Sequence, residues 1–555
     1  MKKLFTLALA CILAFASFAQ EPGEINTNFG TDGTFVFHPS KVESLGYHDK
    51  VYKVLVQEDG KILTVGESRT DGYNYAIYVS RHNVDGTLDE TYGEGGYVFL
   101  KVDELIFKNC PYDAVIGEDG LLYVAGYSWN GYNRGFILCL DENGFENEEY
   151  GDKGWVVTED EDPYGLVYEG IDIDSKGRCV VVGYYKDEII VKRYNAKGKL
   201  DMTFGEDGIT WIELDSDPSA HSYAYDVKIL DDGKIIFCGD KRVQAEDGGF
   251  FIWSYMMRLN ANGSVDESFG ENGVVYLWTG EYAEFALSIA VQPNGKYLVG
   301  GHDELYSATP EYPRYESYIT RVNTDGTIDE TFGENGYVKV EPFQGDGCVN
   351  YSYSILAAPD GQIFGLVYSW NMYENVFRAY VYNLTEDGQY NEDFAGSGII
   401  PLPKVDEEQC EVDAYSIALQ GNDNLIVGGY VAFSAGDYTK IYLTSVNVAV
   451  EGNEGNEGNE GNEEEEEGDD NLGFEEMQNV AFSINPNPAT TTIFIESALN
   501  ESAQVSIIDL TGRCVKEVVI SNTVSSINIE DVESGVYFIS VQQGDNNYVE
   551  KLVIK

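Results

Sequence analysis

Short runs of alternating apolar and polar residues, each followed by a tight turn, recur along most of this 555-residue chain. One example starts at Ile289, turns at Asn294-Gly295 and ends at Gly301. Alternation every second residue is typical of a half-buried strand, and the glycine supplies the positive φ of a tight hairpin turn. The same pattern covers residues 54–66, 115–126, 171–183, 227–239, 289–301, 356–366 and 417–429. It predicts seven β-hairpins.

A longer polar turn separates each hairpin from the next. Its fullest copy runs from Asn323 to Val338 and contains Asp325-Gly, Asp329 and Phe332-Gly. An apolar run precedes this turn and another follows it, so each period holds four short strands and no helical periodicity. The turn ends in an aromatic residue at Phe29, Tyr92, Tyr150, Phe204, Phe269, Phe332 and, in a decayed copy, Phe394, at spacings of 54 to 65 residues. The period predicts a repeated four-stranded antiparallel sheet.

The two ends of the repeat region are complementary. The first copy, residues 23–38, contains only the fourth strand (Thr34–Phe37), whereas the last unit, residues 415–448, lacks the fourth strand. A single four-stranded sheet cannot bury both of its faces, so neighbouring sheets must stack. We therefore expect an all-β fold, a seven-bladed β-propeller of four-stranded antiparallel blades. Its N-terminal strand completes the last blade in a velcro closure.

The repeat itself resembles a known family. The pattern Asp-Gly-x-x-Asp-x-x-Phe-Gly-x-x-Gly, paired with the hairpin described above, is similar to the delta-60 repeat over residues 23–448. The resemblance implies a propeller and supplies no catalytic residue. Tyr150 and Ala395 depart from the Phe-Gly step in the third and seventh repeats.

The segments on either side of the repeats have other compositions. Residues 1–19 read as a signal peptide, with cleavage between Ala19 and Gln20, because the apolar run is shorter than the roughly 20 residues of a membrane-spanning helix. Residues 449–478 are rich in Glu, Gly and Asn and predict a flexible acidic linker. Residues 479–555 return to short alternating strands and predict a small β-sandwich.

This last segment resembles the C-terminal sorting domain of the type IX secretion system. The matching residues are Pro486, Asn487, Pro488, Gly512, Gly535, Tyr537, Lys551 and Lys555. The resemblance implies a Bacteroidota-type bacterium, Sec-dependent export to the periplasm, and the type IX machinery as a partner. It places the protein at the cell surface or in the medium.

The net charge and the positions of the cysteines limit the partners, cofactors and disulfides that can be expected. The net charge of −60 argues against nucleic acid as a partner, because phosphate binding needs a basic surface. We expect no cofactor: the acidic turn does not have the spacing of an EF-hand and is explained by turn geometry, with calcium the weaker alternative. Cys139, Cys179 and Cys238 lie in apolar strands and are expected in the core. The pairing of Cys110, Cys348 and Cys410 stays open.

The variable connections share one face of the predicted ring, and a rigid scaffold with variable loops is a common arrangement for binding. The candidate binding residues are Tyr127, Trp129, Tyr132, Tyr184, Tyr185, His302, Tyr306, Tyr368, Trp370, Tyr373 and Tyr430. We expect a monomeric binding protein rather than an enzyme, with a glycan or a protein as its ligand. The alternatives are a scaffold without a small ligand and a glycan-active hydrolase, which would need two carboxylates at a fixed separation.

Overall fold

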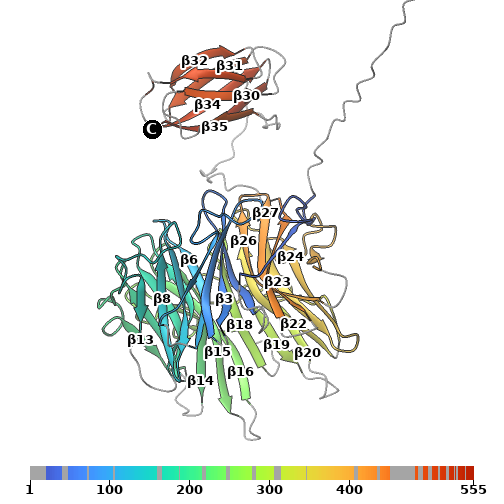
Figure 1. The fold of residues 1–555 in the computed structure, drawn as a ribbon. Coiled ribbons are helices and arrows are strands. Elements are labelled where there is room, and N and C mark those ends of the chain that lie inside the picture. The colour runs from blue at the N-terminus through green and yellow to red at the C-terminus, as the bar shows by residue number, and fades with distance from the viewer. Residues whose placement is uncertain are drawn as a thin grey trace, which may run out of the picture. The chain divides into compact units, whose positions relative to one another are not determined.

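The structure is a computed structural model of the chain, and it separates into two compact units, residues 1–456 and 457–555. It describes residues 21–39, 48–71, 74–103, 107–158, 165–186, 188–214, 220–244, 250–277, 283–305, 314–345, 347–405, 410–433, 438–449, 482–485, 492–497, 503–509, 513–520, 524–529, 532, 535–543 and 546–554. The predicted signal peptide lies outside these residues, and so does the predicted linker apart from residue 449. Every element of the described residues is a strand (Figure 1).

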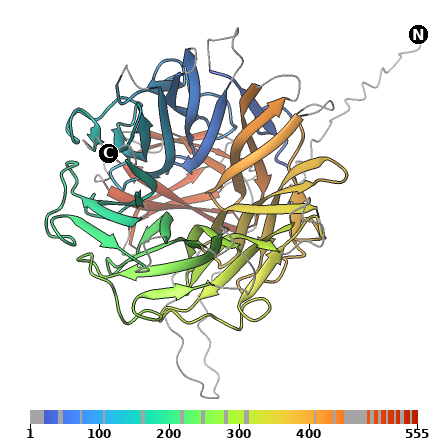
Figure 2. The ribbon, with the colours of Figure 1, turned by 90° about the horizontal axis from the view of Figure 1, so that it is seen from below.

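The first unit consists of seven four-stranded antiparallel meanders, here called blades 1 to 7, arranged around a common axis (Figure 2). Blade 1 contains β2 (Asp49–Val56), β3 (Ile62–Asp71), β4 (Asn74–His82) and β5 (Tyr97–Leu100). Blade 2 contains β6 (Lys108–Ile116), β7 (Leu122–Trp129), β8 (Asn133–Leu140) and β9 (Trp155–Val157). Blade 3 contains β10 (Leu166–Ile173), β11 (Cys179–Tyr185), β12 (Glu188–Tyr194) and β13 (Ile209–Ile212). Blade 4 contains β14 (His221–Ile229), β15 (Ile235–Gln244), β16 (Phe250–Leu259) and β17 (Val274–Tyr276).

Blades 5 and 6 follow the same plan. Blade 5 contains β18 (Ala283–Val291), β19 (Tyr297–Leu305), β20 (Arg314–Val322) and β21 (Tyr337–Val340). Blade 6 contains β22 (Cys348–Ala357), β23 (Ile363–Asn371), β24 (Val376–Leu384) and β25 (Ile399–Pro401). Single parallel bridges, Ile252–Ala283 and Tyr315–Val349, connect blades 4, 5 and 6 into one continuous sheet.

Blade 7 joins the two ends of the repeat region. It contains β26 (Cys410–Gln420), β27 (Asn424–Phe433) and β28 (Tyr438–Asn447), and its fourth strand is β1 (Thr34–Phe37). β1 runs antiparallel to β28, with Thr34 opposite Thr444 and Phe37 opposite Ile441. This pairing confirms the seven-bladed propeller and its velcro closure.

The recurring turn holds each blade to the next. The backbone N–H that follows the aromatic residue donates a hydrogen bond to a turn carbonyl of the following blade, and the ring of such bonds is complete. The pairs are Gly93–Asn143, Gly151–Lys197, Gly205–Asn262, Gly270–Asp325, Gly333–Asp387, Ala395–Pro22 and Gly30–Asp85. Ala395 adopts a φ of 54°, a conformation that glycine adopts in the other copies, so the decayed seventh copy makes the same contact.

The acidic residues of the turn have protein partners. In blade 5, Arg321 Nε lies 2.6 Å from the Asp329 carboxylate, and Arg321 Nη1 donates to the Glu386 carbonyl of blade 6. The same guanidinium lies over the Phe332 ring at 4.8 Å. Arg81, Arg193 and Arg258 repeat this arrangement. Within the described ranges, no group of three or more His, Cys, Asp or Glu side chains is placed to hold a metal ion.

The core lies between the blades. One apolar cluster joins Val65 and Ile77 of blade 1 to Val124 and Phe136 of blade 2, and similar clusters follow around the ring. Cys139, Cys179 and Cys238 are completely buried, which confirms their predicted core positions. Cys348 has a free thiol that donates to the Gln344 carbonyl, so it forms no bridge to Cys410.

The second unit contains two sheets that share one apolar core. A three-stranded sheet has the order β29 (Phe482–Asn485), β30 (Thr492–Ser497), β33 (Val524–Asn528). The other sheet has the order β32 (Cys514–Ile520), β31 (Ala503–Asp509), β34 (Gly535–Gln543), β35 (Asn546–Ile554). Ile493, Val505, Ile539 and Leu552 are buried between the sheets, which confirms the predicted β-sandwich.

The predicted sorting-motif residues lie partly in these strands. Gly535 begins β34, Tyr537 is buried in that strand, and Lys551 lies in β35 opposite Phe538. Pro486, Asn487, Pro488, Gly512 and Lys555 lie outside the described residues. In the described part of the chain, no helix is long and apolar enough to cross a membrane.

Candidate binding site at the propeller axis

The first strand of every blade borders the propeller axis. These inner strands are β2, β6, β10, β14, β18, β22 and β26, and each contacts the inner strand of the next blade (Figure 2). Side chains along them enter the two flanking blade interfaces. On β2, Val51 and Val54 pack against blade 7, and Leu55 packs on the cluster shared with blade 2. A residue at which the alternation along an inner strand is interrupted can direct its side chain towards the axis instead.

Each inner strand has one such residue, because each contains a β-bulge. The pairing between the first two strands shifts by one residue at the same place in all seven blades. A bulge places two residues opposite one and redirects the extra side chain. The redirected residues, here called the axial ring, are Tyr52, Tyr112, Glu169, Tyr225, Leu287, Tyr353 and Tyr415. All seven are half-buried, between fully buried neighbours in most blades.

A second set of equivalent residues lies beside the axial ring. On the second strand of each blade, one position pairs with the inner-strand residue two places before the bulge. This flanking ring consists of Glu67, Tyr127, Tyr184, Asp240, His302, Tyr368 and Tyr430. Five of its members are sequence-predicted binding residues, so the structure brings these five together around the axis.

The tyrosines of neighbouring blades contact one another across the blade boundaries. The rings of Tyr353 and Tyr415 stack with centroids 4.9 Å apart. Tyr415 in turn meets Tyr52 edge to face at 5.7 Å, and Tyr430 lies 5.8 Å from Tyr415. Blades 6, 7 and 1 therefore present a continuous tyrosine surface to the axis.

Three carboxylates at the axis accept hydrogen bonds from axial-ring tyrosines. Glu67 accepts from Tyr52 at 2.9 Å, Asp240 from Tyr225 at 2.5 Å, and Asp413 from Tyr415 at 2.9 Å. Asp240 is also paired with Arg242, whose Nε lies 2.7 Å away. These bonds fix the orientation of the tyrosine rings.

Asp413 has a second donor, the Tyr430 hydroxyl at 3.0 Å. Burial raises the pKa of Asp413 to about 6, although both tyrosine hydroxyls and Lys50 favour the ionised form. Burial has the same effect on Glu169, whose pKa rises to about 8. Among the described residues, no hydrogen bond or ion pair involves the Glu169 carboxylate.

The remaining sequence-predicted residues lie farther along the hairpins. Tyr185 ends β11 and packs edge to face against Trp211 at 5.7 Å. Tyr132 lies in the turn after β7, 6.0 Å from the Arg134 guanidinium, and Tyr373 is 58% exposed in the turn after β23. Tyr306 lies outside the described residues.

The placement of both tryptophans in connecting loops is wrong. Trp129 ends β7, where it pairs with Asn133, and Trp370 lies within β23. Both hairpins continue pairing beyond the predicted strand ends, so their turns are shorter. Trp129 is 43% exposed, whereas Trp370 stacks on Phe377 at 4.9 Å and its Nε1 is buried. Trp370 is therefore a packing residue at least in part.

Sequence analysis missed the axial ring, although a signal for it exists. Each member lies eight residues before the glycine of its hairpin turn, or before Asp423 in blade 7. Tyrosine occupies this position in five of the seven blades. A rule based on alternating residues does not detect this position, because the bulge interrupts the alternation there.

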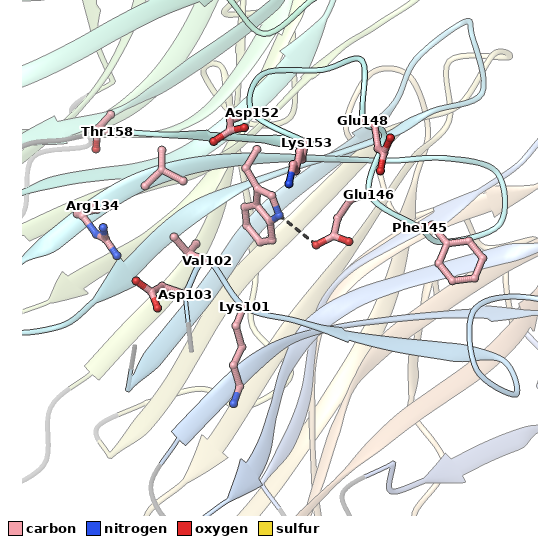
Figure 3. A pocket seen from close by; sticks show the side chains of 12 residues that line it. Lys101, Val102, Asp103, Arg134, Phe145, Glu146, Glu148, Asp152, Lys153 and Thr158 are labelled. Carbon is pink, nitrogen blue, oxygen red and sulfur yellow. Dashed lines mark hydrogen bonds between the residues drawn. The ribbon is translucent and has the colours of Figure 1, made fainter. Parts of the chain in front are cut away.

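A groove on the outer side of blades 1 and 2 is a weaker candidate (Figure 3). It has a volume of about 690 Å³, and Trp155 at its wall donates from Nε1 to Glu146 at 3.2 Å. Its charged lining residues are Lys101, Arg134, Lys153, Asp103, Glu146, Glu148 and Asp152. The lining mixes basic and acidic side chains, and none of the sequence-predicted binding residues contributes.

Two family models match the chain. Residues 483–555 match the secretion system C-terminal sorting domain. A β-propeller domain of unknown function, DUF5122, matches residues 57–92, 118–145, 230–269 and 292–332, in blades 1, 2, 4 and 5. These matches confirm the resemblance to delta-60-like repeats and to the sorting domain. The sorting domain indicates export by the type IX secretion system to the cell surface or beyond, as predicted.

No curated protein matches the chain. Among solved structures, a protein of unknown function from Dyadobacter fermentans is 12% identical with a TM-score of 0.39, over 75% of this chain and 98% of that one. The Penicillium chrysogenum α-L-arabinanase complexed with arabinobiose is 13% identical with a TM-score of 0.35, over 60% and 92%. The β-propeller domain of the Trilobed protease from Pyrococcus furiosus is 10% identical with a TM-score of 0.36, over 73% and 96%. Likeness at this level says nothing about the chemistry of this chain.

Proposed function

For a chain that carries DUF5122 propeller repeats and a type IX sorting domain, we propose that the exported propeller is a binding protein and that its ligand binds at the axial tyrosine surface. The ligand is a glycan or an extracellular protein segment that reaches the axis from the face with the variable connections. The sorting domain serves delivery and the propeller serves recognition.

The observation that carries this proposal is the composition of the axial ring. Five of seven equivalent positions are tyrosine, and all of them keep part of their surface accessible. A residue that only filled space between blades would be expected to be buried and apolar, as Val51 and Val54 are. Tyrosine offers a large apolar face and a polar edge, and this combination is frequent at binding surfaces.

The fixed orientation of the rings supports the same proposal. Bonds from Tyr52, Tyr225 and Tyr415 to nearby carboxylates hold these side chains before any ligand arrives. A preorganised surface loses less conformational entropy on binding, so more of the contact energy remains as affinity.

An array of glycans and outer-surface proteins tests the proposal, with the full chain compared with Tyr112→Ala and Tyr353→Ala. The Tyr353 hydroxyl makes no hydrogen bond within the described residues, and the Tyr112 hydroxyl interacts with Tyr127. Both substitutions therefore remove mainly aromatic surface. Each should weaken binding of a true ligand by about fivefold or more, which corresponds to roughly 1 kcal/mol. Phe251→Ala removes a more accessible ring, 47% exposed, from β16 and should leave binding unchanged. Equal binding of every hit by all three variants would contradict the axial site.

A hydrolytic role is the second candidate, and one feature favours it. Glu169 and Asp413 both have a pKa raised towards neutrality, as a carboxyl group acting as general acid requires. The check is release of reducing ends from any glycan that the array identifies, with Glu169→Gln and Asp413→Asn as separate variants. Hydrolysis that both variants abolish would support an enzyme, whereas binding without turnover would support the first proposal.

A further inference from the structure

Glu169 is the one carboxylate in the axial ring, and tyrosines surround it. Its neighbours in the ring are Tyr112 on blade 2 and Tyr225 on blade 4. Tyr112 packs against Tyr127 at 5.6 Å, and Tyr223 lies between Tyr184, at 4.8 Å, and Tyr225, at 6.5 Å. Aromatic rings from three consecutive blades thus line the axial surface next to this carboxylate.

Glu169 differs from the other axial acids in having no partner within the described residues. Glu67, Asp240 and Asp413 each accept a tyrosine hydroxyl. Burial alone raises the pKa of Glu169, with no basic side chain of the described ranges opposing it, and Arg242 on blade 4 is already paired with Asp240. A carboxylate removed from water without a counter-charge costs free energy, and a ligand that supplies the counter-charge recovers it.

We propose that Glu169 and the tyrosines beside it bind an organic ammonium group of the extracellular ligand, such as an amine or a methylated amine. This inference rests on the proposed binding function and names the chemistry of its ligand. The carboxylate supplies the opposite charge, and the faces of Tyr112 and Tyr225 supply cation–π attraction. A neutral saccharide would stack on the rings without favouring ionisation of Glu169, and an anion would favour its protonated form.

Proton release is the signature of this site. The pKa of Glu169 is raised to about 8 by burial, so in the free protein at pH 7 the carboxyl group is mostly protonated. A bound cation stabilises the ionised form, and binding therefore expels a proton. The other groups that titrate or carry charge around Glu169 are Tyr112 on β6, Tyr184 on β11, Tyr225 on β14, and the Asp240–Arg242 pair on β15. The tyrosine pKa values are raised above 10, so these hydroxyls stay neutral at pH 7.

Titration calorimetry of the purified full chain tests the proposal, with n-butylammonium and tetramethylammonium chloride as probes and n-butanol as the neutral control. We expect binding of both cations and none of n-butanol. The measured enthalpy should change between phosphate and HEPES buffers at pH 7, in proportion to the difference between the protonation enthalpies of the two buffers. Glu169→Gln should weaken cation binding by about tenfold or more and abolish the buffer dependence. Glu94→Gln makes the same change at an exposed carboxylate of a turn and should alter neither.

Cation binding that survives Glu169→Gln, or equal binding of n-butanol, would overturn the inference. Its failure is separable from failure of the proposed function. If array ligands are lost with Tyr112→Ala but are neutral and insensitive to Glu169→Gln, the axial site stands and the ammonium assignment is wrong. If no array ligand depends on the tyrosines and no cation binds, both are wrong.

Discussion

Tyrosine replaces phenylalanine before the glycine of the recurring turn in blades 1 and 2, and the two hydroxyl groups have different surroundings. Both Tyr92 and Tyr150 are only 1% exposed. The Tyr150 hydroxyl lies 3.2 Å from Cys179 Sγ, whereas the buried Tyr92 hydroxyl has no hydrogen-bond partner within the described residues. A buried polar group without a partner costs free energy relative to its apolar counterpart.

We therefore predict that Tyr92→Phe stabilises the protein by about 1 kcal/mol. The ring and its contact with Arg81, 4.8 Å away, remain in the variant. Tyr150→Phe is the matched control and should be neutral or slightly destabilising, because it removes the contact with Cys179. Urea unfolding of the three proteins measures both effects. The reverse order of stability would show that water or another group satisfies the Tyr92 hydroxyl.

Glu169 should make the stability of the propeller depend on pH. Its folded pKa of about 8 lies above the value of roughly 4.3 expected in the unfolded chain. Between these values the folded state holds the extra proton, so stability falls as pH rises from about 4 to 8. We predict that Glu169→Gln, which cannot ionise, removes this part of the decline. Unfolding free energies at pH 5 and pH 8 provide the measurement, with Glu94→Gln as the control. Parallel slopes for all three proteins would contradict the raised pKa.

For single residues, the sequence predicts which positions of different blades are equivalent better than it predicts how buried each side chain is. Trp129 and Trp370 do occupy equivalent positions. Each pairs with the inner-strand residue four places before the bulge of its blade, Trp129 with Lys108 and Trp370 with Val349. Only one of them is well exposed. The difference depends on Phe377, which stacks on Trp370 from the third strand, and no local pattern in the sequence announces that contact.

Among the elements, β1 has the clearest energetic role. It covers the free edge of β28, and its Phe35 contacts His82 of blade 1 at 5.0 Å. Without β1, blade 7 would expose an unpaired edge and lose its outer contacts with blade 1.

We predict that a chain starting at His38 is less stable than a chain starting at Glu21 by at least about 3 kcal/mol. Truncation of a single buried Phe typically costs that much. The shorter chain lacks the buried Phe29 as well as the half-buried Phe35 and Phe37 of β1. Both chains lack residues 1–20, so the difference measures the N-terminal segment of residues 21–37, which contains β1 and the turn bonds of Pro22 and Gly30. Chemical unfolding monitored by tryptophan fluorescence measures the difference. Equal unfolding midpoints would mean that the ring does not depend on its velcro strand.

The strands themselves are largely predictable from the sequence. The predicted Thr34–Phe37 coincides with β1, and the apolar run predicted after the fullest copy of the turn corresponds to β21. Period-two alternation and the glycine turns carry this information. The axial ring is not predictable by the same rule, because a bulge inserts one residue and reverses the alternation. The site therefore lies where the regular pattern of each inner strand is interrupted.

For the whole molecule, repetition explains why the fold was more predictable than the function. Seven copies of one turn repeat the same interblade hydrogen bond, so an altered copy such as Ala395 hardly weakens the inference. The axial ring also repeats in position, but its side chains differ in chemistry, as Tyr353, Glu169 and Leu287 show.

Delivery of the protein is the property of the whole chain that can be tested most directly. The propeller closes on itself within the residues before the acidic segment, and the sandwich has its own core around Ile507 and Ile539. Each unit should therefore fold without the other. We predict that a chain ending at residue 478 folds but stays in the periplasm of its native host, because the sorting domain that addresses it to the type IX machinery is missing.

Cell fractionation with immunoblotting measures the location, and thermal unfolding of the purified truncated chain measures its folding. The matched control deletes residues 452–462 from the acidic segment and keeps the sorting domain, so it should reach the surface or the medium in normal amounts. A truncated chain that is unfolded would show that the propeller depends on the sandwich. A folded truncated chain that reaches the surface normally would contradict the role of the sorting domain, because export would then be specified within the propeller.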